Sequence, residues 1–297
     1  MPLFFLISGY FLSINRPWKM FLKRKKDALL IPYLFTGFVI VAASIPISLL
    51  THRSPSFEAL RWLLGVFYGN GTDMPSIFPN IPTFIGALWF LLALFWASLF
   101  ARLILQYFSG LLAPMAFIIL FCLGWSTSDS VWWPWDIQAG MTAALFLYIG
   151  YETHTHDLLN RKVPGICVIF VFLFTLGSMY FYSNLEISKN HFGNGIFDPL
   201  RAALITWLII LFSKRIDGSY FAKIMSWFRA NSIVVLAFHI MELNLISWDK
   251  IIQCLLSIGI PNVFAYLFVI AIKIGWASFG IYFVHHSKIM HYVYLRR

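Results

Sequence analysis

Residues 28–50 have the sequence ALLIPYLFTGFVIVAASIPISLL, a run of 23 residues without a charged side chain. The hydrocarbon core of a membrane is about 30 Å thick, and a helix needs about 20 mainly apolar residues to cross it. Inside a bilayer, only helices and closed barrels satisfy every backbone polar group. Because the sequence lacks the alternating pattern of barrel strands, this run predicts a membrane-spanning helix.

The composition extends this prediction to the whole chain. Hydrophobic residues make up 60% of the 297 residues, charged residues make up 11%, and the mean hydropathy is +0.78. Soluble domains carry about 25% charged residues, so a soluble globular protein is excluded. We expect an all-α, polytopic transmembrane bundle that forms one integral membrane domain over residues 1–297. The nine expected spans cover residues 2–14, 28–50, 84–106, 111–126, 134–151, 163–183, 197–213, 231–247 and 262–285.

The distribution of lysine and arginine predicts the orientation, because cytoplasmic loops keep an excess of both. When the links between spans are assigned to alternate sides, one side receives sixteen of the 22 Lys and Arg residues. The other side receives five, and Lys273 lies within the last span. We expect a multi-pass protein of the plasma membrane with a cytoplasmic C-terminus. The net charge of +10 reflects mainly this bias, and it indicates contact with membrane lipid rather than nucleic acid.

The first span is short for a membrane helix. Residues 2–14 would extend about 20 Å at 1.5 Å per residue, less than the hydrocarbon thickness, and the predicted orientation places Met1 outside. We expect a missing N-terminal stretch that supplies one earlier helix and the start of this one. The complete protein would then have ten spans with both ends in the cytoplasm.

Ionisable residues within the spans are the strongest site signal, because charges at membrane depth are costly and normally face the protein interior. Helical spacing predicts that Asn231, His239 and Glu242 form one polar stripe, which Lys273 meets from the last span. Two interpretations remain open. The residues form either a structural ion pair with a hydrogen-bonded histidine, or a general base with an orienting carboxylate.

Other chemically active residue types give weaker signals. We expect the cysteines to be small buried residues of the apolar segments: Cys122, Cys167 and Cys254. No metal site is predicted, because the histidine pairs lack further ligands at metal-site spacing: His154 with His156, and His285 with His286.

Aromatic residues gather near the predicted outer links. A membrane-interface belt is favoured over sugar stacking for the tryptophans of this region: Trp125, Trp132, Trp133 and Trp135. The loop over residues 51–83 is expected to contain an interfacial helix over residues 56–68, followed by the turn sequence Gly69-Asn70-Gly71. Such a helix could cover an outward cavity.

A family resemblance is carried by segments that occur in order along nearly the whole chain. They are PLFFLISGYF (2–11), FLKRKK (21–26), LLIPY (29–33), GALWFL (86–91), WDI (135–137) with FLYIGY (146–151), and ANSI (230–233) with FHIME (238–242). Together they resemble the acyltransferase 3 family of membrane-bound O-acetyltransferases, and the later segments are most similar to the fucose 4-O-acetylase-like branch.

This resemblance implies a ten-helix enzyme that transfers acetyl from acetyl-CoA to a hydroxyl of a cell-surface or exopolysaccharide sugar, free or lipid-linked. His239 and Glu242 would be the catalytic pair. Lys23, Arg24 and Lys25 would hold the phosphates of coenzyme A, with lipid anchoring as an equal alternative. The other residues expected to bind substrate or cofactor are Ser8, Trp89, Asp136, Asn231 and Lys273. At Ser8-Gly9, small-residue packing between helices is favoured over substrate approach.

The chain departs from the family at one important point, because it lacks the first family helix and its catalytic histidine. The chain is therefore either an inactive or shortened form, or it depends on His239 with Glu242. A transporter or flippase for a glycan precursor is the alternative from another class, with the same intramembrane charges forming its path. A further alternative is an inactive homologue that binds acyl-CoA or a partner enzyme.

Overall fold

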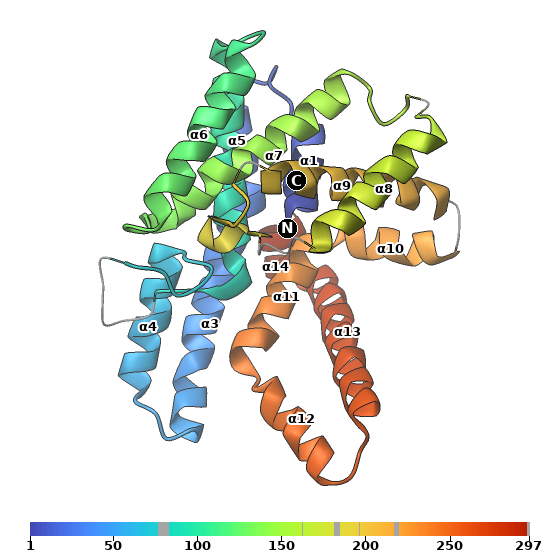
Figure 1. Ribbon diagram of the computed structural model, residues 1–297. Helices are drawn as coiled ribbons and strands as arrows, with labels where there is room; N and C mark the ends of the chain where they lie inside the picture. The colour runs from blue at the N-terminus through green and yellow to red at the C-terminus, as the bar shows by residue number, and fades with distance from the viewer. Residues whose placement is uncertain (77–82, 162, 181–184, 196, 217–219, 296–297) are drawn as a thin grey trace.

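The computed structural model describes residues 1–76, 83–161, 163–180, 185–195, 197–216 and 220–295. The fold is an all-α membrane bundle, as the sequence predicts (Figure 1). The helices are α1 (Pro2–Tyr10), α2 (Trp18–Lys25), α3 (Ile31–Leu50), α4 (Pro55–Tyr68), α5 (Trp89–Tyr107), α6 (Leu112–Ser128), α7 (Ile137–Thr155), α8 (Gly165–Tyr180), α9 (Phe197–Ile216), α10 (Tyr220–Ala230), α11 (Ser232–Leu245), α12 (Trp248–Ser257), α13 (Asn262–His286) and α14 (Lys288–Leu295).

Short elements connect these helices. A π-helical turn, η1 (Lys26–Leu30), joins α2 to α3, and three 3₁₀ turns follow: η2 (Gly86–Leu88), η3 (Pro134–Asp136) and η4 (Ile187–Lys189). The strands β1 (Leu185–Glu186) and β2 (His191–Phe192) pair in antiparallel register around η4. Turns and loops add further backbone bonds, such as those from Ile85 N–H to the Asn70 carbonyl oxygen and from Trp132 N–H to the Pro75 carbonyl oxygen.

Each of the nine predicted spans contains a helix, although residues 181–183 lie outside the described residues. By length and composition, three described helical segments suffice to cross a membrane: Trp18–Leu50, Gly86–Tyr107 and Asn262–His286. A fourth is added if α11 and α12, which meet at an angle of 65°, form one broken span. The predicted orientation stays a prediction.

Two boundaries differ from the predictions. Helix α1 ends at Tyr10, four residues before the predicted end of the first span, and the segment that follows contains polar residues. The basic stretch after it, expected in the link between the first two spans, is helical, and α2 continues through η1 into α3 over 33 residues. Lys23, Arg24 and Lys25 therefore lie on a helix.

Helices α1 and α7 cross with their backbones in contact. A Cβ atom added at Gly9 would lie 2.0 Å from the carbonyl oxygen of Leu147, and one added at Gly150 would lie 1.9 Å from that of Leu6. Small residues permit such close approach between membrane helices. The geometry supports the packing interpretation of the Ser8-Gly9 sequence, because Gly9 lies in the crossing itself.

The predicted helix before Gly69 is confirmed as α4, which packs beside α3 (Figure 1). Gly69 ends it with φ at 86°, a left-handed conformation that glycine adopts without a steric penalty. Val66 of α4 meets the open side of Gly37 on α3, where an added Cβ would lie 2.7 Å from a Val66 methyl group. Helices α3 and α4 therefore pack closely against each other, and residues 51–54 join the end of α3 to the start of α4.

Two predictions about apolar residues are wrong. The three cysteines are exposed rather than buried: Cys122, Cys167 and Cys254. In a membrane helix an apolar side chain can face lipid as well as the core, so low polarity does not predict burial. Trp132, expected in an interface belt, is fully buried, and its indole N–H donates to Asp136 Oδ1 over 3.1 Å.

Candidate functional site

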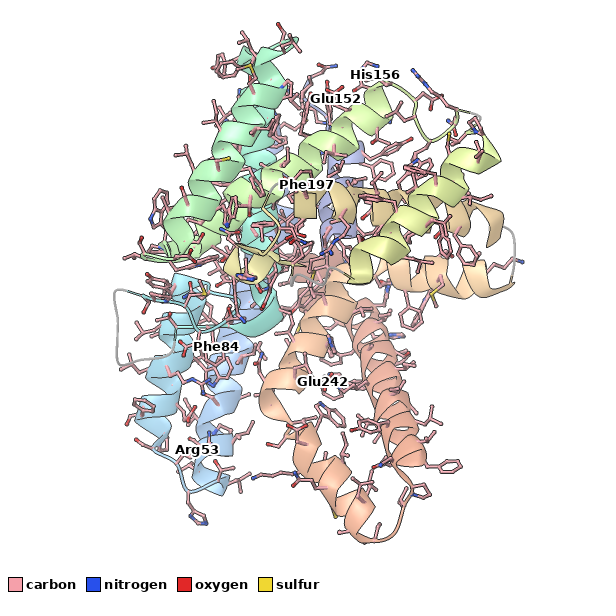
Figure 2. All side chains as sticks on the ribbon, in the orientation of Figure 1. Arg53, Phe84, Glu152, His156, Phe197 and Glu242 are labelled. Atoms are coloured by element: carbon pink, nitrogen blue, oxygen red, sulfur yellow. The ribbon has the colours of Figure 1, made fainter. Side chains whose placement is uncertain are left out.

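Glu242 of α11 lies at the centre of a cluster of polar side chains from α11, α12 and α13. Its side chain is 1% exposed and lies between α11 and α13 (Figure 2). Carboxylate oxygen Oε1 accepts a hydrogen bond from His239 Nδ1 over 2.8 Å and lies 3.3 Å from Lys273 Nζ. Oxygen Oε2 accepts the indole N–H of Trp248. The structure confirms the predicted proximity of His239, Glu242 and Lys273.

Three elements bring these residues together. His239 and Glu242 are three residues apart on α11, so they share one face of the helix. The chain then turns by 65° at Ile246 and Ser247, and α12 begins at Trp248, whose ring returns to the carboxylate. Lys273 projects from α13, about midway along that helix.

The contact between α11 and α13 is fixed just beside the cluster. An added Cβ at Gly280 would lie 2.4 Å from the ring of Phe238, so α13 approaches α11 closely there. Trp276 Nε1 donates to the carbonyl oxygen of Phe238 over 2.9 Å. The positions of His239 and Lys273 relative to each other therefore depend on a packed interface rather than on flexible loops.

The charges in the cluster balance each other. A buried carboxylate is costly unless it is paired and hydrogen-bonded, and Glu242 has three donors. Lys273 Nζ also lies 4.9 Å from the centroid of the Trp248 ring, a cation–π contact. One carboxylate thus organises a cation, an indole and an imidazole.

The tautomer of His239 follows from its partner. A carboxylate only accepts hydrogen bonds, so Nδ1 carries the hydrogen, and in the neutral ring Nε2 keeps a lone pair. The His239 side chain is 46% exposed, in contrast to the buried carboxylate behind it. This arrangement gives an accessible nitrogen base whose ring is oriented by a buried acid.

A cavity of about 640 Å³ lies beside the cluster, between the α11–α12 corner and α13. Two of the three partners of Glu242, Trp248 and Lys273, line it. Ile246 and Ser247, the non-helical residues at the corner, also line it. Irregular backbone within a membrane is tolerated where it faces a cavity or protein. The non-helical backbone at Ile246 and Ser247 meets this condition, because both residues line the cavity.

Asn231 does not join this cluster, although its partner His285 lies on α13, the helix that also carries Lys273. It precedes α11, eleven residues before Glu242, which is about 16 Å along a helix axis. Its Nδ2 donates to the Trp227 carbonyl oxygen over 2.9 Å, and its Oδ1 lies 2.9 Å from His285 Nε2. The α11 stripe therefore divides into two separate hydrogen-bonded groups, and His285 has a partner that sequence reasoning did not find.

The basic residues of α2 form a separate surface. Lys23 and Arg24 are exposed, whereas Lys25 is half-buried with its Nζ 5.8 Å from the Phe21 ring centroid. Among the described residues, no ion pair joins these cations to Glu242.

The other predicted site residues lie in the part of the core built around α1, α5 and α7. Ser8 is half-buried on α1, and Trp89 is buried with its ring 6.3 Å from that of Phe5. Asp136 is fully buried, and both it and Trp135 have a positive φ, so the chain turns sharply before α7. None of these residues lines the cavity beside Lys273.

Trp248 is the site residue that sequence reasoning missed. The signal was the sequence Asn244-Leu245-Ile246-Ser247-Trp248, which places two polar residues where the predicted span ends. A serine before Trp248 is typical of a helix start, and it marks α12 as a new helix rather than a continuation. A long apolar pattern alone does not show that the chain turns back.

Comparison with protein families gives a match over almost the whole chain. The family model described as an acyltransferase domain, that of acyltransferase 3, matches residues 1–295. No curated protein and no solved structure matches the chain. With its all-α membrane fold, the chain therefore belongs to the acyltransferase 3 family and is a membrane acyltransferase.

Proposed function

We propose that this acyltransferase moves acetyl from acetyl-CoA to a hydroxyl of a cell-surface or exopolysaccharide sugar, with His239 as the general base. The observation that carries the proposal is the 2.8 Å bond between His239 Nδ1 and the buried carboxylate of Glu242. An acid that orients a histidine strengthens it as a base. The adjoining cavity, which is lined by Trp248 and Lys273 but not by His239, offers space for a substrate beside this pair.

The proposed reaction is a direct transfer. His239 Nε2 removes the proton of the acceptor hydroxyl while the hydroxyl oxygen attacks the thioester carbonyl carbon. Lys273 lines the cavity and supplies positive charge for the carbonyl oxygen as it becomes negative. The carbon–sulfur bond then breaks, and the His239 imidazolium returns the proton to the departing thiolate. An ester and free coenzyme A are formed without net change in protons.

Exposed cations suit the phosphates of coenzyme A. Lys23 and Arg24 project from α2, and Lys25 lies beside them against Phe21. Phosphate groups bind to such clusters through charge-assisted hydrogen bonds. On the predicted orientation these residues face the cytoplasm of a plasma-membrane protein. Binding to anionic lipid at the same cations is the alternative.

A second candidate function is transport of a glycan precursor. The observation that favours it is the 65° break between α11 and α12 beside intramembrane charges, an arrangement that also occurs in transporters. Transport and transfer predict different products. Transfer leaves an ester on the acceptor, whereas transport moves an unchanged molecule.

The experiment supplies isotope-labelled acetyl-CoA to membranes that contain the protein, together with glycan from the producing cell. We expect label on the glycan in a form that hydroxylamine removes, and no such label in membranes from cells without the protein. Accumulation of unmodified glycan precursor in sealed vesicles, with no labelled ester, would contradict transfer and support transport.

A further inference from the structure

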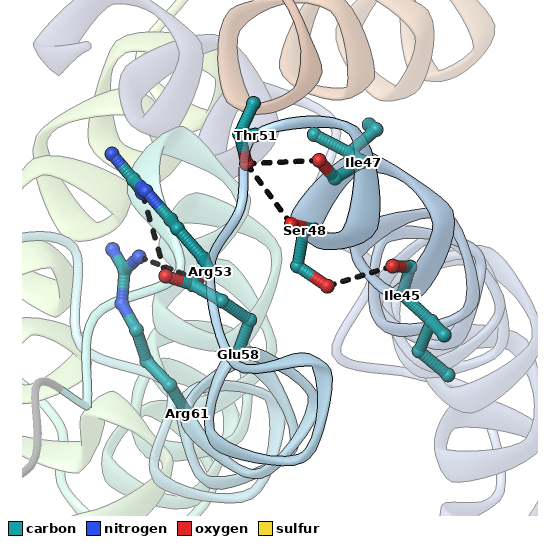
Figure 3. A network of polar contacts seen from close by, with 7 residues as sticks. All are labelled: Ile45, Ile47, Ser48, Thr51, Arg53, Glu58 and Arg61. Atoms are coloured by element: carbon teal, nitrogen blue, oxygen red, sulfur yellow. Dashed lines mark hydrogen bonds and ion pairs between the residues drawn. The ribbon is translucent and has the colours of Figure 1, made fainter.

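A second, smaller cavity lies where the end of α3, the start of α4 and the end of α11 meet. Its volume is about 80 Å³, and its polar lining includes Ser48, Thr51, Arg53, Glu58, Arg61 and Asn244. At about 30 Å³ per water molecule, this space holds two or three waters or one acidic group of similar size. Figure 3 shows the part of this polar wall that comes from α3, α4 and the loop between them.

The basic side of this cavity contains two arginines and one carboxylate. Arg53 Nη1 lies 3.4 Å from Glu58 Oε1, and Arg61 Nη1 lies 3.3 Å from Glu58 Oε2 (Figure 3). The three groups carry a net charge of +1. Glu58 therefore holds both guanidinium groups in place without neutralising them.

Arg61 has a hydrogen-bond donor that no described residue satisfies. Its guanidinium lies over the rings of Trp62 and Phe84, with centroid distances of 4.8 and 5.0 Å. The Nε atom is buried and has no partner within the described part of the chain. A water-sized group cannot reach this buried atom, so a ligand in the cavity is contacted by other atoms of Arg61, which lines it. Arg53, whose side chain is 66% exposed, can move toward the same ligand.

The opposite side of the cavity supplies acceptors. Ser44, Ser48 and Thr51 use their hydroxyl hydrogens on backbone carbonyl oxygens of α3, at 2.7, 2.7 and 2.9 Å. Their oxygen lone pairs are therefore available for donors of a ligand. Arginine donors on one wall and hydroxyl oxygens on the other suit a ligand that combines an anion with hydroxyl groups.

The small cavity adjoins the proposed catalytic site. Asn244 lines both this cavity and the larger one, and it lies two residues after Glu242 on α11. Asn244 Nδ2 donates to the Ile240 carbonyl oxygen over 3.0 Å, which fixes its side chain along the helix. A ligand held near Arg53 and Arg61 would thus lie at the C-terminal end of α11, about 8 Å along the helix axis from His239.

We infer that this cavity binds the acidic group, a carboxylate or a phosphate, of the sugar acceptor. The identification of the ligand as the sugar acceptor rests on the proposed acetyl transfer. The test measures binding alone and does not require that activity. The acidic group bonds to the guanidinium groups of Arg53 and Arg61, and neighbouring sugar hydroxyls donate to the serine and threonine oxygens. The acceptor is therefore an acidic or phosphate-linked sugar rather than a neutral one.

The test is equilibrium binding to the full-length protein in detergent at low ionic strength, where charge interactions are least screened. The probes are methyl glucuronide, glucose 1-phosphate and methyl glucoside. We expect one or both anionic probes to bind at least about tenfold more tightly than the neutral probe, the effect of one charge-assisted hydrogen bond. Preference for the glucuronide alone indicates a carboxylate, and preference for the phosphate alone indicates a phosphate-linked sugar.

Variants assign the binding to this cavity. Arg53→Gln should remove the preference, and Arg53→Lys should restore part of it because the charge is kept. Arg53 is mostly exposed, so neither change disturbs the core. Lys250→Gln is the matched control, because Lys250 is an exposed cation outside the cavity. Equal binding of all three probes, or an unchanged preference in Arg53→Gln, would overturn the inference.

The result separates this inference from the proposed function. Selective binding that survives in His239→Gln supports the cavity even if no acetyl transfer is detected. Acetyl transfer with equal binding of charged and neutral probes supports the enzyme and rejects the acidic acceptor.

Discussion

At the scale of single residues, the account depends on Glu242 and its three donors. The sequence predicted His239, Glu242 and Lys273 as a group, because ionisable residues at membrane depth must find partners. Sequence reasoning missed Trp248, which reaches the carboxylate only because the chain turns at Ile246 and Ser247. Asn231 fitted the same helical stripe, yet distance along α11 gives it a different partner, His285.

The carboxylate itself can be tested by Glu242→Gln, which keeps the shape and removes the charge. The amide no longer stabilises an imidazolium at His239, and it leaves Lys273 without its counter-charge. We expect the rate of acetyl transfer to fall at least about tenfold, with less effect on the KM for acetyl-CoA. Initial rates at saturating and limiting acetyl-CoA measure both. An unchanged rate would limit Glu242 to a structural role.

The indole donor can be tested by Trp248→Phe. The variant keeps an aromatic ring for Lys273 but leaves Glu242 Oε2 without the N–H of Trp248. We expect a loss of about 1–3 kcal/mol in the free energy of unfolding, the cost of an unsatisfied buried acceptor. Thermal unfolding in detergent measures it, and full stability in the variant would show that water replaces the indole.

At the scale of elements, helices were more predictable than their ends. Apolar runs located a helix for every predicted span, and the turn sequence after Tyr68 correctly ended α4. The corner between α11 and α12 was not predicted, because apolar residues continue on both sides of it. The basic link proved to be helix α2, since lysine and arginine favour helices as readily as loops.

The α1–α7 crossing gives a prediction about Gly150→Ala. The added methyl carbon would lie 1.9 Å from the Leu6 carbonyl oxygen, so the two backbones must separate. Overpacking of this kind typically costs about 1–3 kcal/mol, and we expect a lower unfolding temperature in detergent. Gly177→Ala is the matched control, because nothing lies within 4 Å of its added Cβ. Equal stability of the two variants would argue against backbone contact at the crossing.

At the scale of the whole molecule, the sequence established the membrane class and the family resemblance, and the match over residues 1–295 confirms the family. Composition alone could not predict which apolar faces meet lipid. The exposed cysteines are an example, because lipid and the protein core are equally apolar surroundings. The cavity at the α3, α4 and α11 ends combines residues far apart in the sequence, and no local pattern connects them.

The predicted orientation can be tested by labelling single cysteines in intact cells with a membrane-impermeant maleimide. In a background without the three native cysteines, Lys250→Cys should react from outside, and Lys288→Cys should react only after the membrane is opened. The reverse pattern would invert the orientation and place the cations of α2 outside. Those cations could then not bind coenzyme A from the cytoplasm.

The most direct test of the central claim is the rate of acetyl transfer by purified wild-type protein, His239→Gln and His156→Gln in lipid nanodiscs. His156 undergoes the same substitution, but it pairs with Glu152 on α7, away from the cluster. The account predicts that His239→Gln loses about 100- to 10,000-fold in rate, the usual contribution of a general base, while His156→Gln keeps the wild-type rate. A wild-type rate in His239→Gln would contradict the account and remove the α11 cluster as the site of catalysis.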